Sequence, residues 1–226
     1  MEAARRRLSA VRGAVCPLRQ GPSASALLDA ARPLRGCEWG VEVPAGAVDL
    51  ATCSRGDVEA LGELAVRHGL VVIRSDRSLV LHGRRQFEIT TWLSPVSGVF
   101  TGHQQHPEQQ HPAVFRLSND PALGVPGAGS TFHHDSMHLD SIPPFAIYHL
   151  QVTPSAGGQT HFAFADPQQL SHAEREAWRL LRGFHPGGTG VGVHPLLAES
   201  ADSDRPYLYP VRFLLSALHD RSLLPP

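Results

Sequence analysis

The chain has 226 residues, 21 glycines, 19 prolines and a formal net charge of −1, which suits one sizeable β-rich domain with many turns. A pI near 6.9 gives no reason to expect nucleic acid or an anionic membrane as a partner. The three cysteines lie in the N-terminal quarter without metal-ligand spacing, and no apolar run reaches 18 residues. We therefore expect a reducing compartment and no membrane span.

The first part of the chain is rich in arginine. Residues 1–20 carry five arginines and a single acid, a composition typical of an organelle transit peptide. A disordered tail explains the same composition equally well. We assign residues 1–35 to such a tail or transit peptide and residues 36–226 to one domain. The expected location is cytoplasmic, with a mitochondrion or another organelle as the alternative.

A strand, a helix and a second strand are predicted next. Trp39, Val41 and Val43 alternate as in a half-buried strand. Ser54 is a typical N-cap for a helix that presents one apolar face and ends at His68–Gly69. The apolar run 70–73 predicts a buried strand, and residues 77–93 predict a second helix.

The second half is predicted to be mainly strands. Residues 94–131 form a long loop with one strand at 114–117, and we expect a lid or active-site loop there. Ser171–Glu174 is a capping box, so a helix should follow it and stop at Gly183. Its expected apolar stripe is Ala177, Trp178 and Leu181. Further strands are expected at 143–152, 191–197 and 206–211. This order of elements indicates an α+β domain.

A His-x-Asp triplet lies within Phe132–Ser136. Residues i and i+2 of an extended strand share a face, so His133 and Asp135 can offer an imidazole nitrogen and a carboxylate oxygen to one ion, while His134 points away. They would supply two thirds of the two-His-one-carboxylate triad of non-haem Fe(II) oxygenases. The same triplet also occurs by chance on solvated loops. The motif alone leaves both interpretations open.

Several segments occur in the order found in one family, and together they span residues 36–213. They are Gly40–Leu50, His68–Arg74, Phe132–Ser136, the Gly-Gly-x-Thr of Thr153–Thr160, the capped helix after Asp166, Val193–Leu196 and Arg205–Tyr209. In this order they resemble the taurine dioxygenase/clavaminate synthase-like family of Fe(II)/2-oxoglutarate-dependent dioxygenases. Phe132–Ser136 is similar to the aromatic-His-x-Asp iron motif of that family.

The resemblance implies a fold and a set of cofactors. The fold would be a double-stranded β-helix (jelly roll) with flanking helices, expected to be incomplete at the C-terminus. Fe(II) would be held by His133 and Asp135, with 2-oxoglutarate and O₂ as co-substrates. Thr160 would hydrogen-bond the distal carboxylate of 2-oxoglutarate. No other side chain is assigned a catalytic role.

The resemblance also bears on the substrate, which is expected to be a small organic molecule that is hydroxylated or oxidatively cleaved, with succinate and CO₂ as co-products. His103 and His106 match the region where relatives contact substrate. Gly129 stands where taurine-using relatives place an Asn, which argues against taurine itself.

One departure from the family pattern lies near the C-terminus. The second iron His of the family, and the Arg downstream that pairs with the co-substrate carboxylate, have no clear counterpart after Tyr209. His194 and His219 are the alternatives for a third ligand. We expect the domain to be incomplete at this end. Losing the Arg would remove a charge-assisted contact worth about 1.5–3 kcal/mol.

Three functions therefore remain open from the sequence. The first is an Fe(II)/2-oxoglutarate-dependent dioxygenase. The second is a non-catalytic relative that keeps the fold as a binding module, which the missing distal ligands favour. The third is a hydrolase or lyase that uses the same His/Asp cluster for Zn²⁺. The Gly-Gly-x-Thr segment favours the first function over the third.

Overall fold

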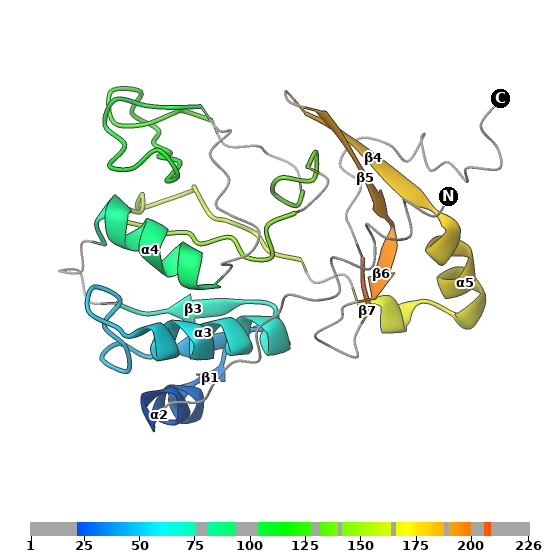
Figure 1. Ribbon diagram of the computed structural model, residues 1–226, viewed down its shortest axis with the longest axis horizontal. Helices are drawn as coiled ribbons and strands as arrows, with labels where there is room; N and C mark the ends of the chain where they lie inside the picture. Colours follow the sequence, from blue (N-terminus) through cyan, green and yellow to red (C-terminus); the bar gives the residue numbers. More distant parts are fainter. Residues whose placement is uncertain are drawn as a thin grey trace. The chain divides into compact units, whose positions relative to one another are not determined.

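The structure, a computed structural model, describes residues 22–75, 81–93, 104–127, 132–139, 142–163, 166–187, 190–199 and 206–208 (Figure 1). The chain divides into two compact units. The first unit holds the described residues 22–75, and the second holds nearly all described residues from 81 onward. None of the helices in these ranges is long and apolar enough to cross a membrane.

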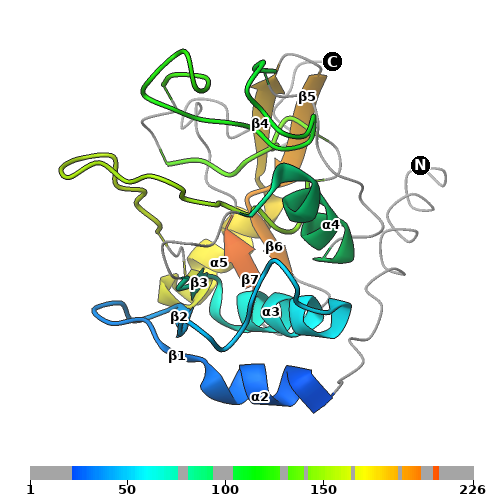
Figure 2. The same ribbon diagram turned by 90° about the vertical axis from the view of Figure 1, so that its left-hand side faces the viewer.

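The first unit packs two helices and a small sheet. Its elements are α2 (Pro22–Ala30), β1 (Arg32–Pro33), β2 (Val41–Val43), α3 (Arg55–His68) and β3 (Val71–Ile73). Strand β2 is central: it pairs antiparallel with β1 and parallel with β3. Helices α2 and α3 lie side by side in both views (Figures 1 and 2).

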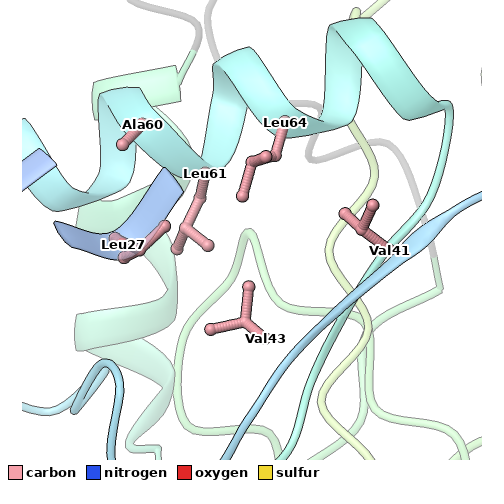
Figure 3. Close-up of a cluster of buried hydrophobic side chains, with 6 residues drawn as sticks. All are labelled: Leu27, Val41, Val43, Ala60, Leu61 and Leu64. Carbon is pink, nitrogen blue, oxygen red and sulfur yellow. The ribbon is translucent and has the colours of Figure 1, made fainter. Parts of the chain in front are cut away.

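A cluster of buried aliphatic side chains joins these elements. Leucines of α3 and a leucine of α2 meet the two valines of β2 (Figure 3). Val43 has no exposed surface, and Leu27 of α2 is 2% exposed. The full cluster is Leu27, Val41, Val43, Ala60, Leu61 and Leu64. Helix α2 and strand β1 therefore belong to the packed unit, although they fall within residues 1–35, where a tail or transit peptide was expected.

Local signals set the ends of α3 as predicted. The Ser54 hydroxyl accepts from the backbone N–H of Asp57 at 3.2 Å, and the Asp57 carboxylate accepts from the Ser54 N–H at 2.8 Å. This reciprocal capping box satisfies donors that the first helical turn leaves open. Gly69 ends the helix with a φ of 76°, a conformation that costs glycine little. Strand β3 is confirmed at Val71–Ile73, but it is half-buried rather than fully buried.

The second unit is built from short helices and hairpin-like pairs of strands. Its elements are α4 (Gly83–Leu93), the 3-10 helix η2 (Pro167–Gln169), α5 (His172–Leu180), β4 (Arg182–Gly187), β5 (Gly190–Pro195), β6 (Leu197–Glu199) and β7 (Pro206–Leu208). Strands β4 and β5 pair antiparallel, and β6 pairs with β7 (Figure 1).

Several predicted elements of this unit differ from the structure. The strand predicted at 143–152 is absent from the described residues 142–152, which are irregular, and the one at 114–117 is reduced to a bridge between Leu117 and Val125. Among the described residues, α4 begins at Gly83. A strand needs a neighbour to bond with, and residue periodicity does not report whether one is available.

The capping box of Ser171 is confirmed, but the expected end of the following helix is wrong. Helix α5 ends at Leu180, since Leu181 is extended with φ −82° and ψ 149°. Gly183 instead lies in β4, opposite His194 of β5. No residue of α5 is buried, so the predicted apolar stripe does not enter a core in the described part of the chain.

The described residues therefore form a mixed α and β structure with small sheets, in agreement with the α+β prediction. They do not trace a double-stranded β-helix. Part of the predicted 206–211 strand is present as β7, and residues 209–211 lie outside the described ranges.

Replacement of Ser54 by Ala should destabilise the first unit. The change removes the hydroxyl acceptor of the capping box, so we expect a loss of about 1 kcal/mol in the free energy of unfolding. Urea denaturation followed by circular dichroism measures it. Ser54→Thr keeps the acceptor and is the control; equal losses in both variants would contradict the role of the cap.

Candidate metal centre

His133 and Asp135 lie side by side in the second unit. The Nε2 atom of His133 is 3.3 Å from Oδ1 of Asp135, and the two side chains are 32% and 53% exposed. Two adjacent ligands of an octahedral divalent ion, each about 2.1 Å from the metal, stand about 3.0 Å apart. The pair therefore fits two neighbouring positions on one ion with a small adjustment. Their role as ligands stays a prediction.

The backbone brings these side chains together through a turn rather than a strand. Residues 132–134 are irregular and residues 135–138 form a turn, in which the N–H of Leu139 donates to the carbonyl of Ser136 at 3.0 Å. Ser136 has a φ of 61°, in the left-handed region that a residue with a Cβ occupies at a cost of about 1–2 kcal/mol. Strain of this kind clusters at functional sites, and here it follows Asp135 directly.

A tyrosine from a distant segment contacts the same carboxylate. The phenol of Tyr148 donates to Oδ2 of Asp135 at 2.7 Å. Partial desolvation raises the pKa of Tyr148 well above its ordinary value, and the hydrogen bond to Asp135 and its negative charge raise it further. The phenol consequently stays protonated and remains a donor at neutral pH. Tyr148 also makes an edge contact with Phe162, with ring centroids 6.4 Å apart.

His134, between the two expected ligands, has a different environment. Desolvation lowers the pKa of its imidazole, the nearby charge of Asp135 acts in the opposite direction, and His133 lowers the pKa further. The residue nevertheless keeps an exposed surface. A neutral imidazole at this position adds no positive charge next to a metal.

The β4–β5 hairpin, which comes later in the chain, contacts the turn that follows the His-x-Asp motif. The Nε2–H of His194 donates to the carbonyl oxygen of Met137 at 2.9 Å, and both residues are buried. Gly192 lies at the same contact: a Cβ there would collide with the Met137 carbonyl oxygen and would stand 2.8 Å from Nε2 of His194. A hydrogen bond and a close backbone approach thus fix Met137, two residues after Asp135.

A second buried imidazole lies next to His194. The rings of His185 on β4 and His194 on β5 have centroids 5.8 Å apart, and the two side chains are 6% and 7% exposed. Nε2 of His185 has no hydrogen-bond partner among the described residues. Burial lowers the pKa of His185, and the neighbouring His194 lowers it further. His185 is therefore a neutral member of the hairpin interior.

The remaining predicted site residues are placed as follows. Thr160 is exposed in the irregular segment 142–163. His106 uses both ring nitrogens within its own loop: Nε2 donates to the carbonyl of Pro121 at 3.1 Å, and Nδ1 accepts from the N–H of Glu108 at 3.1 Å. His103 and His219 lie outside the described residues. The roles assigned to Thr160, His103 and His106 stay predictions.

No third ligand joins His133 and Asp135 in the part of the chain that the structure describes. There, no group of three or more His, Cys, Asp or Glu side chains gathers in a way that could hold a metal. His194, one alternative for the third ligand, directs Nε2 at the Met137 carbonyl. The hydrogen bond from this nitrogen holds the backbone of the segment that carries the His-x-Asp motif, residues 132–139.

Two residues that shape the site were missed by the sequence reasoning. Tyr148 was placed only within the strand predicted at 143–152, and Gly192 was not singled out. No local signal connects either residue to the His-x-Asp motif, because the contacts join segments 13 and more residues apart.

The chain matches the family described as "Taurine catabolism dioxygenase TauD, TfdA family" over residues 30–214. This match covers most of the chain and includes His133, Asp135, Tyr148 and His194. The chain belongs to this family of dioxygenases. Comparisons with curated proteins and with solved structures gave no match.

Replacement of Gly192 by Ala should loosen the motif segment. The added methyl collides with the Met137 carbonyl, so we expect a loss of about 1–3 kcal/mol in unfolding free energy, as for other overpacked sites. Hydrogen exchange should be faster over residues 132–139. Gly56→Ala is the matched control, since its Cβ would meet only the Ser54 hydroxyl at 3.7 Å. Unchanged exchange in Gly192→Ala would refute the close approach.

His185 should make the second unit less stable in acid. Its pKa is lowered in the folded state, so the unfolded chain binds the proton more readily. The stability it contributes is complete above its ordinary pKa of 6.5 and is lost as the pH falls through the folded-state pKa. Urea denaturation at several pH values between 5 and 8 measures this slope. In His185→Leu the slope should be shallower; an identical slope would exclude His185 as its source.

Proposed function

We propose that the chain is an Fe(II)- and 2-oxoglutarate-dependent dioxygenase that hydroxylates or oxidatively cleaves a small organic substrate, with succinate and CO₂ as co-products. The observation that carries the proposal is the 3.3 Å approach of His133 Nε2 to Asp135 Oδ1, within a chain that belongs to a dioxygenase family. Neutral imidazole and carboxylate are the ligand types of non-haem Fe(II) oxygenases. As a family member, the chain is also proposed to use a double-stranded β-helix.

The residues of the site would have separate roles in binding the metal and its co-substrate. His133 and Asp135 would hold Fe(II), which with 2-oxoglutarate and O₂ supplies the oxidising chemistry. The turn at Ser136 and the hydrogen bond from His194 to Met137 would hold the two proposed ligands in place. Thr160 would donate to the distal carboxylate of 2-oxoglutarate. The protein's contribution is orientation of the metal and its co-substrate.

A non-catalytic binding role is the second candidate. It is favoured by the lack of a three-ligand group within the described ranges. Two protein ligands hold a divalent metal less tightly than three, and weak retention of iron would leave the chain with a binding function. Affinity for iron therefore separates the two candidates.

Anaerobic titration of the purified chain with Fe(II) and 2-oxoglutarate tests the proposal. Bidentate binding of the keto acid to Fe(II) should give a weak visible charge-transfer band. His133→Ala and Asp135→Ala should each abolish the band, because each removes one of the two proposed ligands. His134→Ala is the matched control and should keep it.

Absence of the band at millimolar 2-oxoglutarate would exclude the dioxygenase proposal for this chain and support the binding role. A band that persists in both His133→Ala and Asp135→Ala would show that iron is bound elsewhere. Formation of succinate from 2-oxoglutarate in air then measures whether bound iron turns over.

A further inference from the structure

Tyr148 contacts Asp135 from outside the His-x-Asp motif. Its phenol donates to Oδ2 of Asp135 at 2.7 Å, from a segment 13 residues further along the chain. A hydroxyl and a carboxylate at this distance form a charge-assisted hydrogen bond of ordinary length. The hydrogen bond therefore engages one particular oxygen of Asp135, Oδ2.

The two oxygens of Asp135 have different neighbours. Oδ1 lies 3.3 Å from Nε2 of His133, and Oδ2 accepts from the Tyr148 phenol. A carboxylate that is 53% exposed would otherwise rotate broadly about its terminal torsion, because this torsion has no sharp minima. The hydrogen bond removes this freedom and leaves Oδ1 directed at the position next to His133.

The Tyr148 ring is itself held in place. Although the residue is 57% exposed, its ring meets Phe162 edge-on at an interplanar angle of 70°. Edge-to-face geometry is a preferred arrangement for aromatic pairs. Nearby, the Gln86 side chain donates to the carbonyl of Ile147 at 3.5 Å, which ties the segment to α4. Both contacts restrict where the phenol points.

We propose that Tyr148 is a positioning residue for the metal centre: it holds Oδ2 of Asp135 so that only Oδ1, beside His133, is presented to the metal. The proposal rests on the proposed function, since it concerns the same metal site. Outer contacts of this kind orient a ligand and raise metal affinity.

The proposal has a consequence for the number of coordination positions. A carboxylate held through one oxygen occupies one position on the ion, whereas a carboxylate bound through both oxygens occupies two. Tyr148 therefore keeps one more position open for co-substrate or water. Removal of the phenol should change both the affinity for the metal and the coordination number.

The test uses the full chain with Co(II) alone as the probe, without 2-oxoglutarate. Tyr148→Phe keeps the ring and removes only the donor, so we expect about 10- to 100-fold weaker Co(II) binding and an altered visible absorption of the bound ion. Phe162→Leu is the comparison variant: it weakens the restraint on the ring but keeps the phenol that donates to Asp135. Its affinity should stay within about threefold of the unmodified chain, well below the loss expected for an outer contact.

The outcomes separate this inference from the function on which it rests. If the unmodified chain binds Co(II), Asp135→Ala does not, and Tyr148→Phe matches the unmodified chain in affinity and spectrum, Tyr148 has no positioning role and the metal site stands. If the unmodified chain and Asp135→Ala both fail to bind, the metal site and the role of Tyr148 fail together. Equal losses in Phe162→Leu and Tyr148→Phe would assign the effect to ring packing and overturn the proposal.

Discussion

The close approach of β5 to the turn after Asp135 is the constraint on which the candidate site depends. Gly192 has no side chain at the point where the Met137 carbonyl meets the strand, and His194 donates to that carbonyl from the same strand. Both contacts join segments more than fifty residues apart, so the folded hairpin fixes the position of the motif. The partner strand β4 adds the buried His185, and burial lowers the pKa of its imidazole.

The pair of His133 and Asp135 is open to solvent, and its order comes from surrounding contacts. A turn with a left-handed residue sets the path of the backbone, β5 anchors Met137, and Tyr148 engages the far oxygen of Asp135. The hydrogen bond from Tyr148 is exposed and contributes little alone, whereas the one from His194 to Met137 is buried. Together they restrict the carboxylate at its backbone and at its outer oxygen, which is the preorganisation that a metal site requires.

Sequence reasoning succeeded where the cause is local. The N-cap at Ser54, the capping box at Ser171 and the glycine that ends α3 depend on residues within one turn, and all three were predicted. The proximity of His133 and Asp135 was also predicted, although a turn and not a strand produces it.

Predictions were less successful for structure that depends on contact with a segment distant in sequence. Strand β4 was missed because its sequence, RGFHPG, has glycine and proline at positions typical of loops, and only pairing with β5 makes it extended. The 143–152 segment has the pattern of a strand, but the described residues give it no ladder. Tyr148 could not be linked to Asp135 because nothing in the spacing of the two residues encodes their contact.

The left-handed backbone at Ser136 limits which residues can stand next to Asp135. Glycine adopts this conformation at no steric cost, and asparagine or aspartate does so more readily than most residues, whereas valine, isoleucine or threonine would be strained. The position is therefore restricted by its φ angle. Among chains that preserve this turn, variation at residue 136 should stay within small or short polar side chains even when the substrate differs.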